Sequence, residues 1–151
     1  MELRPLNETE LLPAIALVWE VFNEFEAPGY SDEGIKSFRE YIEYENIAAM
    51  LESGEMKIIG CFLDGAMSGV LAVKKLTHIS LLFVKKVFHR QGIATMLFHS
   101  FAESCAASKA EKITVNSAPY AVEFYEKMGF IRTDDERVEA GIRYIPMQYT
   151  V

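Results

Sequence analysis

The chain has 151 residues, of which 50% are hydrophobic, and it carries a formal net charge of −7. No stretch rich in Pro, Gly or Ser divides it, so we expect one domain over residues 1–151 with a substantial core. The negative charge argues against nucleic acid as a partner and favours a cationic ligand such as an amine. The polar N-terminus and the lack of an apolar run of membrane-spanning length predict a cytoplasmic protein with no membrane association.

The first third of the chain predicts one strand and two or three helices. Apolar residues at three- and four-residue spacing indicate amphipathic helices, and a Pro-Gly pair marks a break between them. The expected elements are a strand over residues 1–6, a helix from an Asn7 or Thr9 cap to about Phe25, a break at Pro28-Gly29, a helix capped by Ser31 or Asp32 and reaching Ile42, and a helical or irregular segment to Gly54.

The rest of the chain predicts a hairpin followed by alternating strands and helices. The expected elements are paired strands 56–62 and 66–73 around an Asp64-Gly65 turn, a buried strand 79–84, a helix from Ile93, a strand 112–115, a helix 120–128 closed by Gly129, a strand 130–133, a charged loop 134–141 and a strand 142–149. Pro146 predicts an edge position or a bulge in the last strand. This order is typical of a mixed α/β sheet with helices on its faces.

The two cysteines predict neither a metal site nor a redox centre. Cys61 falls in a predicted strand and Cys105 in a predicted helix, and no CxxC spacing is present. Two buried free thiols are what such positions favour in an intracellular protein, so we expect no bound metal.

The stretch from His89 to Ala94 joins the predicted buried strand Ile79–Val84 to the predicted helix beginning at Ile93. Its small residues allow a tight turn, and the N–H groups of a helix N-terminus then point at one place. Together with the helix dipole they form an anion site, for which a phosphate is the expected ligand. Nearby Lys85 and Lys86 support this interpretation; a simple turn is the alternative. The sequence lacks the Gly-Lys-Ser/Thr of a P-loop and the three glycines of a dinucleotide fingerprint.

A second motif runs from Asn116 to Phe130 and reads NSAPYAVEFYEKMGF. In this order, and after a predicted hairpin, it and the HRQGIA turn resemble the GNAT superfamily of acyl-CoA-dependent N-acyltransferases. The resemblance spans residues 3–149. The sequence departs from the family at His89, where Arg or Gln is usual, and at Arg90, where Gly is common.

The resemblance implies a single-domain GNAT fold and acetyl-CoA as co-substrate. The fold is a mixed, mostly antiparallel sheet of about six or seven strands, with a splayed pair of parallel central strands and about four helices. The turn would hold the CoA pyrophosphate through backbone N–H groups, and the central strand would pair with the pantetheine arm. The residues implied in acetyl-CoA binding are Leu82, Phe83, Val84, His89, Arg90, Gln91, Gly92, Ile93, Ala94, Thr95, Asn116 and Tyr125.

The resemblance also implies that Tyr125 is the acid that protonates the departing CoA thiolate. A phenol of reference pKa about 10 can donate a proton to a thiolate whose thiol has a pKa of about 8.5. Tyr120 is a weaker candidate for this role. Packing in the core is the alternative for any of these aromatic side chains, and it is the favoured one for Phe124.

The base that would deprotonate an amine is less well defined by the sequence. Members of the family often carry a Glu on the central strand, where this chain has His78 and Ser80. His78 is a candidate because imidazole titrates near neutral pH. A chain of water molecules, or an acid of the N-terminal helices such as Glu24 or Glu26, is an equal alternative.

Acceptor choice in this family depends on the first two helices and the last hairpin. Phe25 and Tyr30, beside the Pro28-Gly29 break, are therefore candidates to line an aromatic acceptor pocket. The expected reaction is acetyl transfer from acetyl-CoA to a primary amine of a small molecule or peptide, by direct attack in a ternary complex. The alternatives are a non-catalytic acyl-CoA sensor, or a protein lysine or N-terminal acetyltransferase. A homodimer is the expected assembly.

Overall fold

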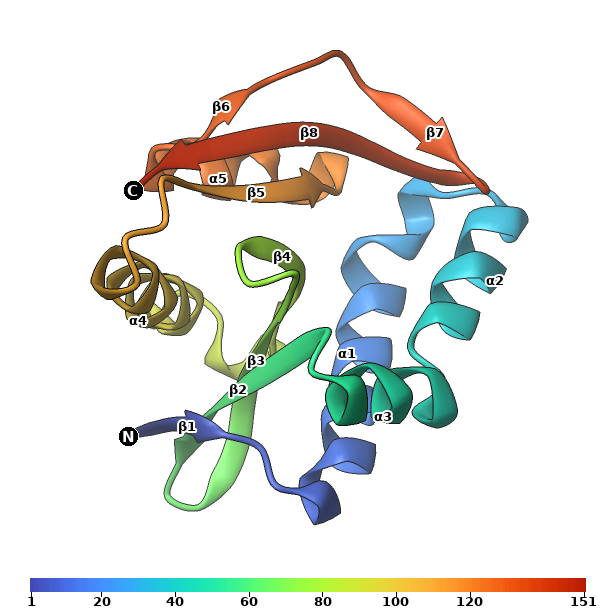
Figure 1. The fold of residues 1–151 in the computed structure, drawn as a ribbon. Coiled ribbons are helices and arrows are strands. Elements are labelled where there is room, and N and C mark those ends of the chain that lie inside the picture. The colour runs from blue at the N-terminus through green and yellow to red at the C-terminus, as the bar shows by residue number, and fades with distance from the viewer.

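An eight-stranded mixed sheet crosses the molecule, and helices cover both of its faces (Figure 1). The computed structural model describes every residue from Met1 to Val151. The strand order is β1-β2-β3-β4-β5-β8-β6, and β7 pairs separately with β8. The strands are β1 (Glu2–Pro5), β2 (Met56–Leu63), β3 (Ala66–Lys74), β4 (His78–Val84), β5 (Lys112–Ser117), β6 (Ile131–Arg132), β7 (Arg137–Glu139) and β8 (Ile142–Thr150). The helices are α1 (Leu11–Phe25), α2 (Asp32–Tyr41), α3 (Tyr44–Ser53), α4 (Ile93–Ala107) and α5 (Val122–Met128).

The predicted hairpin of β2 and β3 is confirmed. Leu63 pairs with Ala66, and the two residues between them have positive φ angles, 50° at Asp64 and 81° at Gly65. This combination matches the right-handed twist of paired strands, and an Asp-Gly pair adopts it at low cost. The turn therefore sets the register in which β3 pairs with β2.

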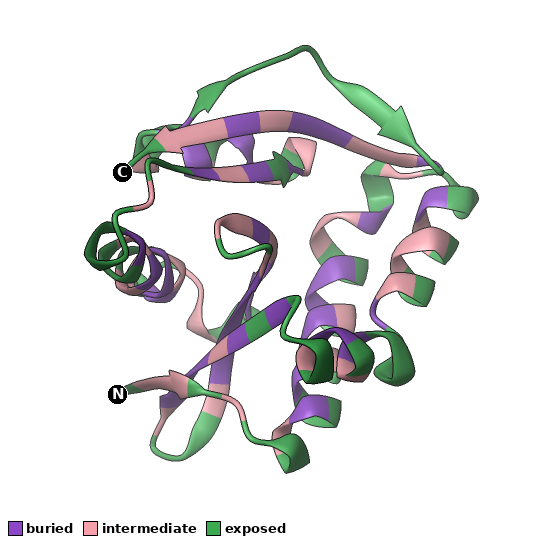
Figure 2. Cartoon of the chain, viewed as in Figure 1, coloured by how far each residue is buried: buried purple, intermediate pink, exposed green.

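Two apolar cores lie on opposite faces of the sheet. One packs α1, α2 and α3 against it and contains the fully buried Phe22; the other packs α4 and α5 against it and contains Leu97 and Phe98. Figure 2 shows the buried positions of these helices turned toward the strands. Because both faces are covered, residues 68–73 of β3 are all buried. Cys61 and Cys105 are buried and unpaired, as predicted.

Local signals explain the beginning of α2 and the end of α3. The Ser31 hydroxyl accepts a hydrogen bond from the Gly34 N–H at 3.2 Å, so Ser31 rather than Asp32 caps α2. The segment predicted as helical or irregular forms α3. It ends at Gly54, whose φ of 83° gives the left-handed turn that closes many helices.

The predicted strand count and one predicted loop need correction. The structure has eight strands, where we expected six or seven. Its five α-helices agree with the expected number of about four, because the segment predicted as helical or irregular forms α3. The extra strand is β7, which lies in the segment predicted as a charged loop. Arg137, Val138 and Glu139 pair with β8, although all three are exposed. No buried apolar side chain marks this strand in the sequence, because all three residues are exposed and the pairing uses backbone groups.

Pro146 does not lie in an edge strand, because β8 runs between β5 and β6, and its register opposite β5 shows no bulge. The pairing with β6 ends at Arg132–Met147, and that with β7 begins at Arg137–Tyr144. Pro146 falls in the gap between these two short strands, where its carbonyl accepts the Thr133 N–H at 2.9 Å. An imino acid is tolerated here because no strand lies opposite its nitrogen.

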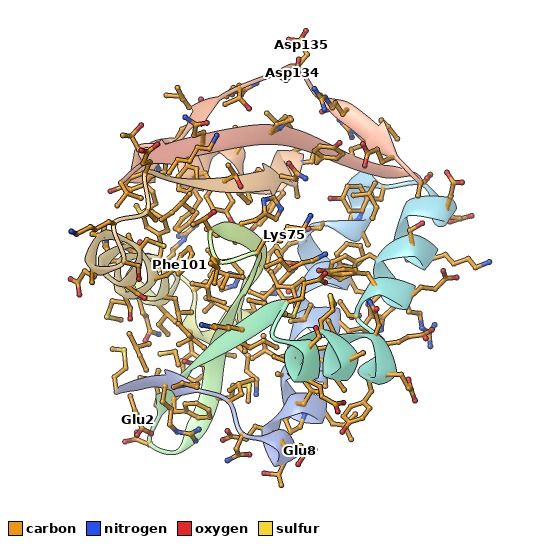
Figure 3. All side chains as sticks on the ribbon, in the orientation of Figure 1. Glu2, Glu8, Lys75, Phe101, Asp134 and Asp135 are labelled. Carbon is orange, nitrogen blue, oxygen red and sulfur yellow. The ribbon has the colours of Figure 1, made fainter.

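The chain between β6 and β7 forms the outer rim of the molecule. Figure 3 labels Asp134 and Asp135 at its tip, pointing away from the sheet. None of the helices has the length and apolar character needed to cross a bilayer.

Candidate functional site

The parallel strands β4 and β5 pair only at their beginnings and then separate. The paired positions are His78 with Thr114 and Ile79 with Val115. Ser80 has no partner on β3, because Val73 pairs with Ile79 and Ala72 with Leu81. A residue inserted in this way is a β-bulge, and bulges increase the local twist of a strand. The bulge therefore lies where β4 turns away from β5, and the edge of β4 that faces β5 is unpaired beyond Ile79.

A cleft of about 370 Å³ opens at this separation. The β4 and β5 strands form its floor, and α5, the end of α1, α2 and the β7–β8 hairpin form its walls. Among the residues that line it are His78, Leu82, Asn116 and Tyr125 from the floor and α5, Glu26 and Tyr30 from the α1–α2 connection, Tyr41 from α2, and Glu139 and Tyr144 from the hairpin.

A larger, mostly apolar hollow of about 1090 Å³ lies elsewhere, between the N-terminal segment, α3 and the second half of α4. None of the site residues predicted from the sequence lines it. The chemistry-bearing side chains gather instead in the smaller cleft between β4 and β5.

The turn before α4 presents a run of free backbone donors. No N–H group from Arg90 to Thr95 donates a hydrogen bond within the protein, whereas the Met96 N–H donates to the Gly92 carbonyl at 2.9 Å. Gly92 has a φ of 76°, and a Cβ built on it meets nothing within 4 Å. The turn therefore combines a positive φ, open space and unpaired N–H groups at a helix N-terminus, which together suit a phosphate group.

The His89 side chain is engaged inside the protein. Its Nε2 lies 2.7 Å from the Val84 carbonyl oxygen, which can only accept, so Nε2 carries the proton. The ring also packs on Phe25, with ring centroids 5.0 Å apart, and Phe25 stacks on Tyr120 at 5.4 Å. His89 thus holds the turn against the end of β4. Phe25 therefore packs between His89 and Tyr120, and it is not among the residues that line the cleft.

Tyr125 reaches the cleft from α5. Its residue is 5% exposed, and its ring packs against Phe124 and Phe130 at centroid distances of 5.2 and 5.1 Å. The Tyr125 hydroxyl has no hydrogen-bond partner within the protein. Since every fully buried polar side-chain atom in the structure has such a partner, the Tyr125 oxygen is not fully buried, and it is open to the cleft that the residue lines. Burial, with a further contribution from the charge of Glu26, raises the pKa of Tyr125 and keeps its proton in place.

His78 lies at the closed end of the cleft, where β4 and β5 still pair. Its Nδ1 is 2.8 Å from the Thr114 hydroxyl oxygen. Burial lowers the pKa of His78, and the positive charges of Lys74 and Lys75 lower it further, so the imidazole is neutral at pH 7. Figure 3 labels Lys75 on the turn that leads into β4.

The structure separates the two acids that the sequence left as alternatives. Glu24 is exposed and pairs with Lys86 at 2.9 Å. Glu26 is half-buried and lines the cleft, and burial raises the pKa of its carboxyl from 4.5 to about 7.

Sequence reasoning assigned no role to several other residues of the cleft. The Tyr41 hydroxyl forms a hydrogen bond with the Ser80 hydroxyl, which connects α2 to the β4 bulge. The Tyr144 hydroxyl donates to the Glu139 carboxylate at 2.8 Å. No motif marks these residues, because they come together only through the packing of distant elements. The structure contains no group of three or more His, Cys, Asp or Glu side chains that could hold a metal ion.

Comparison with known proteins identifies the family to which this fold belongs. The family model of the acetyltransferase (GNAT) domain matches residues 26–151. No curated protein sequence matches the chain. Among solved structures, a GCN5-related N-acetyltransferase from Rhodopseudomonas palustris has a TM-score of 0.87 at 21% identity, covering 99% of this chain and 95% of that one.

Two further structures have the same fold. The PaiA N-acetyltransferase from Thermoplasma acidophilum, solved in complex with coenzyme A, has a TM-score of 0.83 at 20% identity and covers 99% of this chain and 98% of that one. The ribosomal-protein-alanine N-acetyltransferase from Brucella melitensis has a TM-score of 0.69 at 13% identity, with 100% of both chains covered. The family match over most of the chain, together with the splayed β4–β5 pair, establishes that this protein belongs to the GNAT acetyltransferase family.

Proposed function

We propose that the protein transfers an acetyl group from acetyl-CoA to a primary amine of a small molecule or peptide. The observation that carries the proposal is the junction of two features at the end of β4. A run of unpaired N–H groups from Arg90 to Thr95 follows β4, and Leu82 and Phe83 near the end of that strand line the cleft between β4 and β5. The turn would bind the pyrophosphate, and the unpaired edge of β4 would bind the pantetheine arm and direct the thioester toward Tyr125.

In this reaction the amine attacks the thioester directly. The C–N bond forms as the C–S bond breaks, and the thiolate takes the proton of the Tyr125 hydroxyl, which faces the cleft. The Leu82–Val84 backbone would polarise the acetyl carbonyl. No covalent acetyl-enzyme is required, since Cys61 and Cys105 are buried and neither lines this cleft.

The acceptor would enter from the side of the α1–α2 connection. Tyr30 lines the cleft there, and its hydroxyl donates to the Arg143 carbonyl at 3.2 Å, which fixes the ring against β8. An aromatic wall beside carboxylates suits a protonated amine, in agreement with the net charge of −7. Two unpaired thiols favour a reducing compartment such as the cytoplasm.

Calorimetric titration with acetyl-CoA, followed by a thiol-release assay over monoamines, amino acids, polyamines and lysine peptides, tests the proposal. We expect saturable binding and release with one acceptor class. Binding without release from any acceptor would favour an acyl-CoA sensor, and absence of binding would refute the CoA site itself.

A further inference from the structure

We infer that Glu26 receives the ammonium group of the acceptor and takes its proton before the attack. The inference rests on the proposed acetyl transfer to an amine and adds to it the residue that activates the amine. Three observations carry it: the place of Glu26 in the cleft, its lack of a partner, and the engagement of the other candidate groups.

Glu26 follows the last residue of α1, immediately before the turn at Pro28, and lines the same cleft as Tyr125. Tyr30 lines this cleft as well, and the negative charge of Glu26 contributes to raising the pKa of both Tyr125 and Tyr30. The carboxylate therefore shares the cleft with the group proposed to protonate the leaving thiolate. An amine bound to it would occupy the cleft that is proposed to receive the thioester.

The Glu26 carboxylate has no hydrogen bond and no ion pair within the protein. Since no fully buried polar side-chain atom lacks a partner, its oxygens are open to the cleft. A half-buried carboxylate with no partner costs free energy, and an incoming ammonium group would relieve that cost.

The other acid and base candidates of the cleft either form hydrogen bonds within the protein or lie at its closed end. Glu139 is exposed and accepts the Tyr144 hydroxyl at 2.8 Å. His78 is bonded to Thr114 in the closed end, beside the cation of Lys74. The titratable groups that face Glu26 across the cleft are Tyr30 from the α1–α2 connection, Tyr41 from α2, Lys74 and His78 from β3 and β4, Tyr125 from α5, and Glu139 and Tyr144 from β7 and β8.

Glu26 and Tyr125 together account for every proton that moves in the proposed acetyl transfer. The ammonium gives one proton to Glu26, which passes it to solvent, and the free amine attacks the acetyl carbon. When the C–S bond breaks, Tyr125 protonates the thiolate and regains a proton from the nitrogen of the new amide. The sum is one ammonium and one thioester converted to one amide, one thiol and one released proton.

A base works best when its pKa is near the working pH, and burial brings the pKa of Glu26 to about 7. The acid limb of the pH profile should therefore have its midpoint near neutrality. Tyr125 stays protonated through this range because burial and the charge of Glu26 both raise its pKa.

The test compares Glu26→Gln with Glu20→Gln, an equal change on the exposed face of α1. With the fastest amine of the acceptor panel, we expect Glu26→Gln to lower kcat/KM by about 10²- to 10⁴-fold and to abolish the acid limb, with unchanged acetyl-CoA affinity. Glu20→Gln should match the wild-type protein. A Glu26→Gln variant that keeps the rate and the acid limb would overturn the inference while leaving acetyl transfer intact.

A second readout does not depend on turnover. In protein labelled with ¹³C at the Glu side-chain carboxyls, the Glu26 signal is the one that Glu26→Gln lacks. We expect its titration midpoint to lie near 7 and to fall on addition of n-butylammonium, because a bound cation favours the carboxylate. A midpoint unmoved by n-butylammonium would refute Glu26 as the ammonium site. Failure of acetyl-CoA to bind would instead refute the proposed function.

Discussion

Gly92 would contribute to phosphate binding through its backbone alone. Its φ is 76°, and open space surrounds the position of a Cβ. We predict that Gly92→Glu abolishes acetyl-CoA binding in calorimetry, because it places a side chain and a negative charge where the pyrophosphate would lie.

Gly65 provides the matched control for this variant. It has a φ of 81°, and nothing lies within 4 Å of its Cβ position, but it occupies the β2–β3 turn. Gly65→Glu carries the same backbone penalty, about 1–2 kcal/mol, and should bind acetyl-CoA normally. Equal affinity of the two variants would contradict the phosphate assignment.

Tyr125 differs from the other candidate acid, Tyr120, in its surroundings. The Tyr125 hydroxyl faces the cleft, whereas Tyr120 is 57% exposed and stacks on Phe25. We predict that Tyr125→Phe lowers kcat by about 10²-fold or more with little change in acetyl-CoA affinity, since only the proton donor is lost. Steady-state kinetics and calorimetry measure the two quantities. Tyr120→Phe should retain kcat. If kcat fell in Tyr120→Phe and not in Tyr125→Phe, Tyr120 rather than Tyr125 would be the acid.

Among the packed elements, α2 and the β7–β8 turn approach each other through two glycines. A Cβ on Gly34 would lie 2.2 Å from the Gly141 carbonyl oxygen, and nearby the Ser37 hydroxyl donates to the Ala140 carbonyl at 2.7 Å. This contact joins α2 to the β7–β8 hairpin, and both elements contribute residues to the walls of the cleft.

We predict that Gly34→Ala destabilises the protein by about 1–3 kcal/mol, because backbone must move to accommodate the methyl group. Thermal unfolding should show a lower Tm. Gly29→Ala, in the connection that precedes α2, is the control, since its Cβ would lie 3.9 Å from the Arg143 side chain, an ordinary contact. Equal Tm values for the two variants would show that the α2–hairpin contact is not tight.

For the protein as a whole, Glu26 couples stability to pH. Its carboxyl has an ordinary pKa of 4.5 and a pKa of about 7 in the folded protein, because burial disfavours the charge. Between these values the unfolded chain loses its proton first, so this group lowers the free energy of unfolding as the pH rises. The loss is complete above about pH 7 and absent below about pH 4.

We therefore predict that Glu26→Gln raises the free energy of unfolding at pH 8, by up to about 3 kcal/mol, and leaves it nearly unchanged at pH 4. Denaturant titrations at the two pH values measure the difference, with Glu20→Gln as the control. A variant that is not stabilised at pH 8 would mean that Glu26 ionises without cost. A residue that reduces stability while it lines a reactive cleft is the pattern expected of a functional group.

Features that depend on neighbouring residues could be predicted from the amino-acid sequence. The Asp64-Gly65 turn, the buried strand 79–84 and the turn at Gly92 result from local backbone preferences, and the structure confirms each of them. The family match confirms the membership that the two motifs indicated. Such signals can be read along the chain because turns, caps and periodic apolar faces involve residues a few positions apart.

Contacts between distant segments became known only from the three-dimensional fold. β7 forms because exposed residues find a backbone partner on β8, and Pro146 is tolerated because two short strands leave a gap beside it. From the sequence, Glu24 and Glu26 are equal candidates for the base. Only the packing shows that Glu26 lines the cleft while Glu24 pairs with Lys86. The physical reason is that a carboxylate's environment depends on elements distant in sequence. The α1–α2 connection meets β4, β5 and α5 only when the sheet has formed.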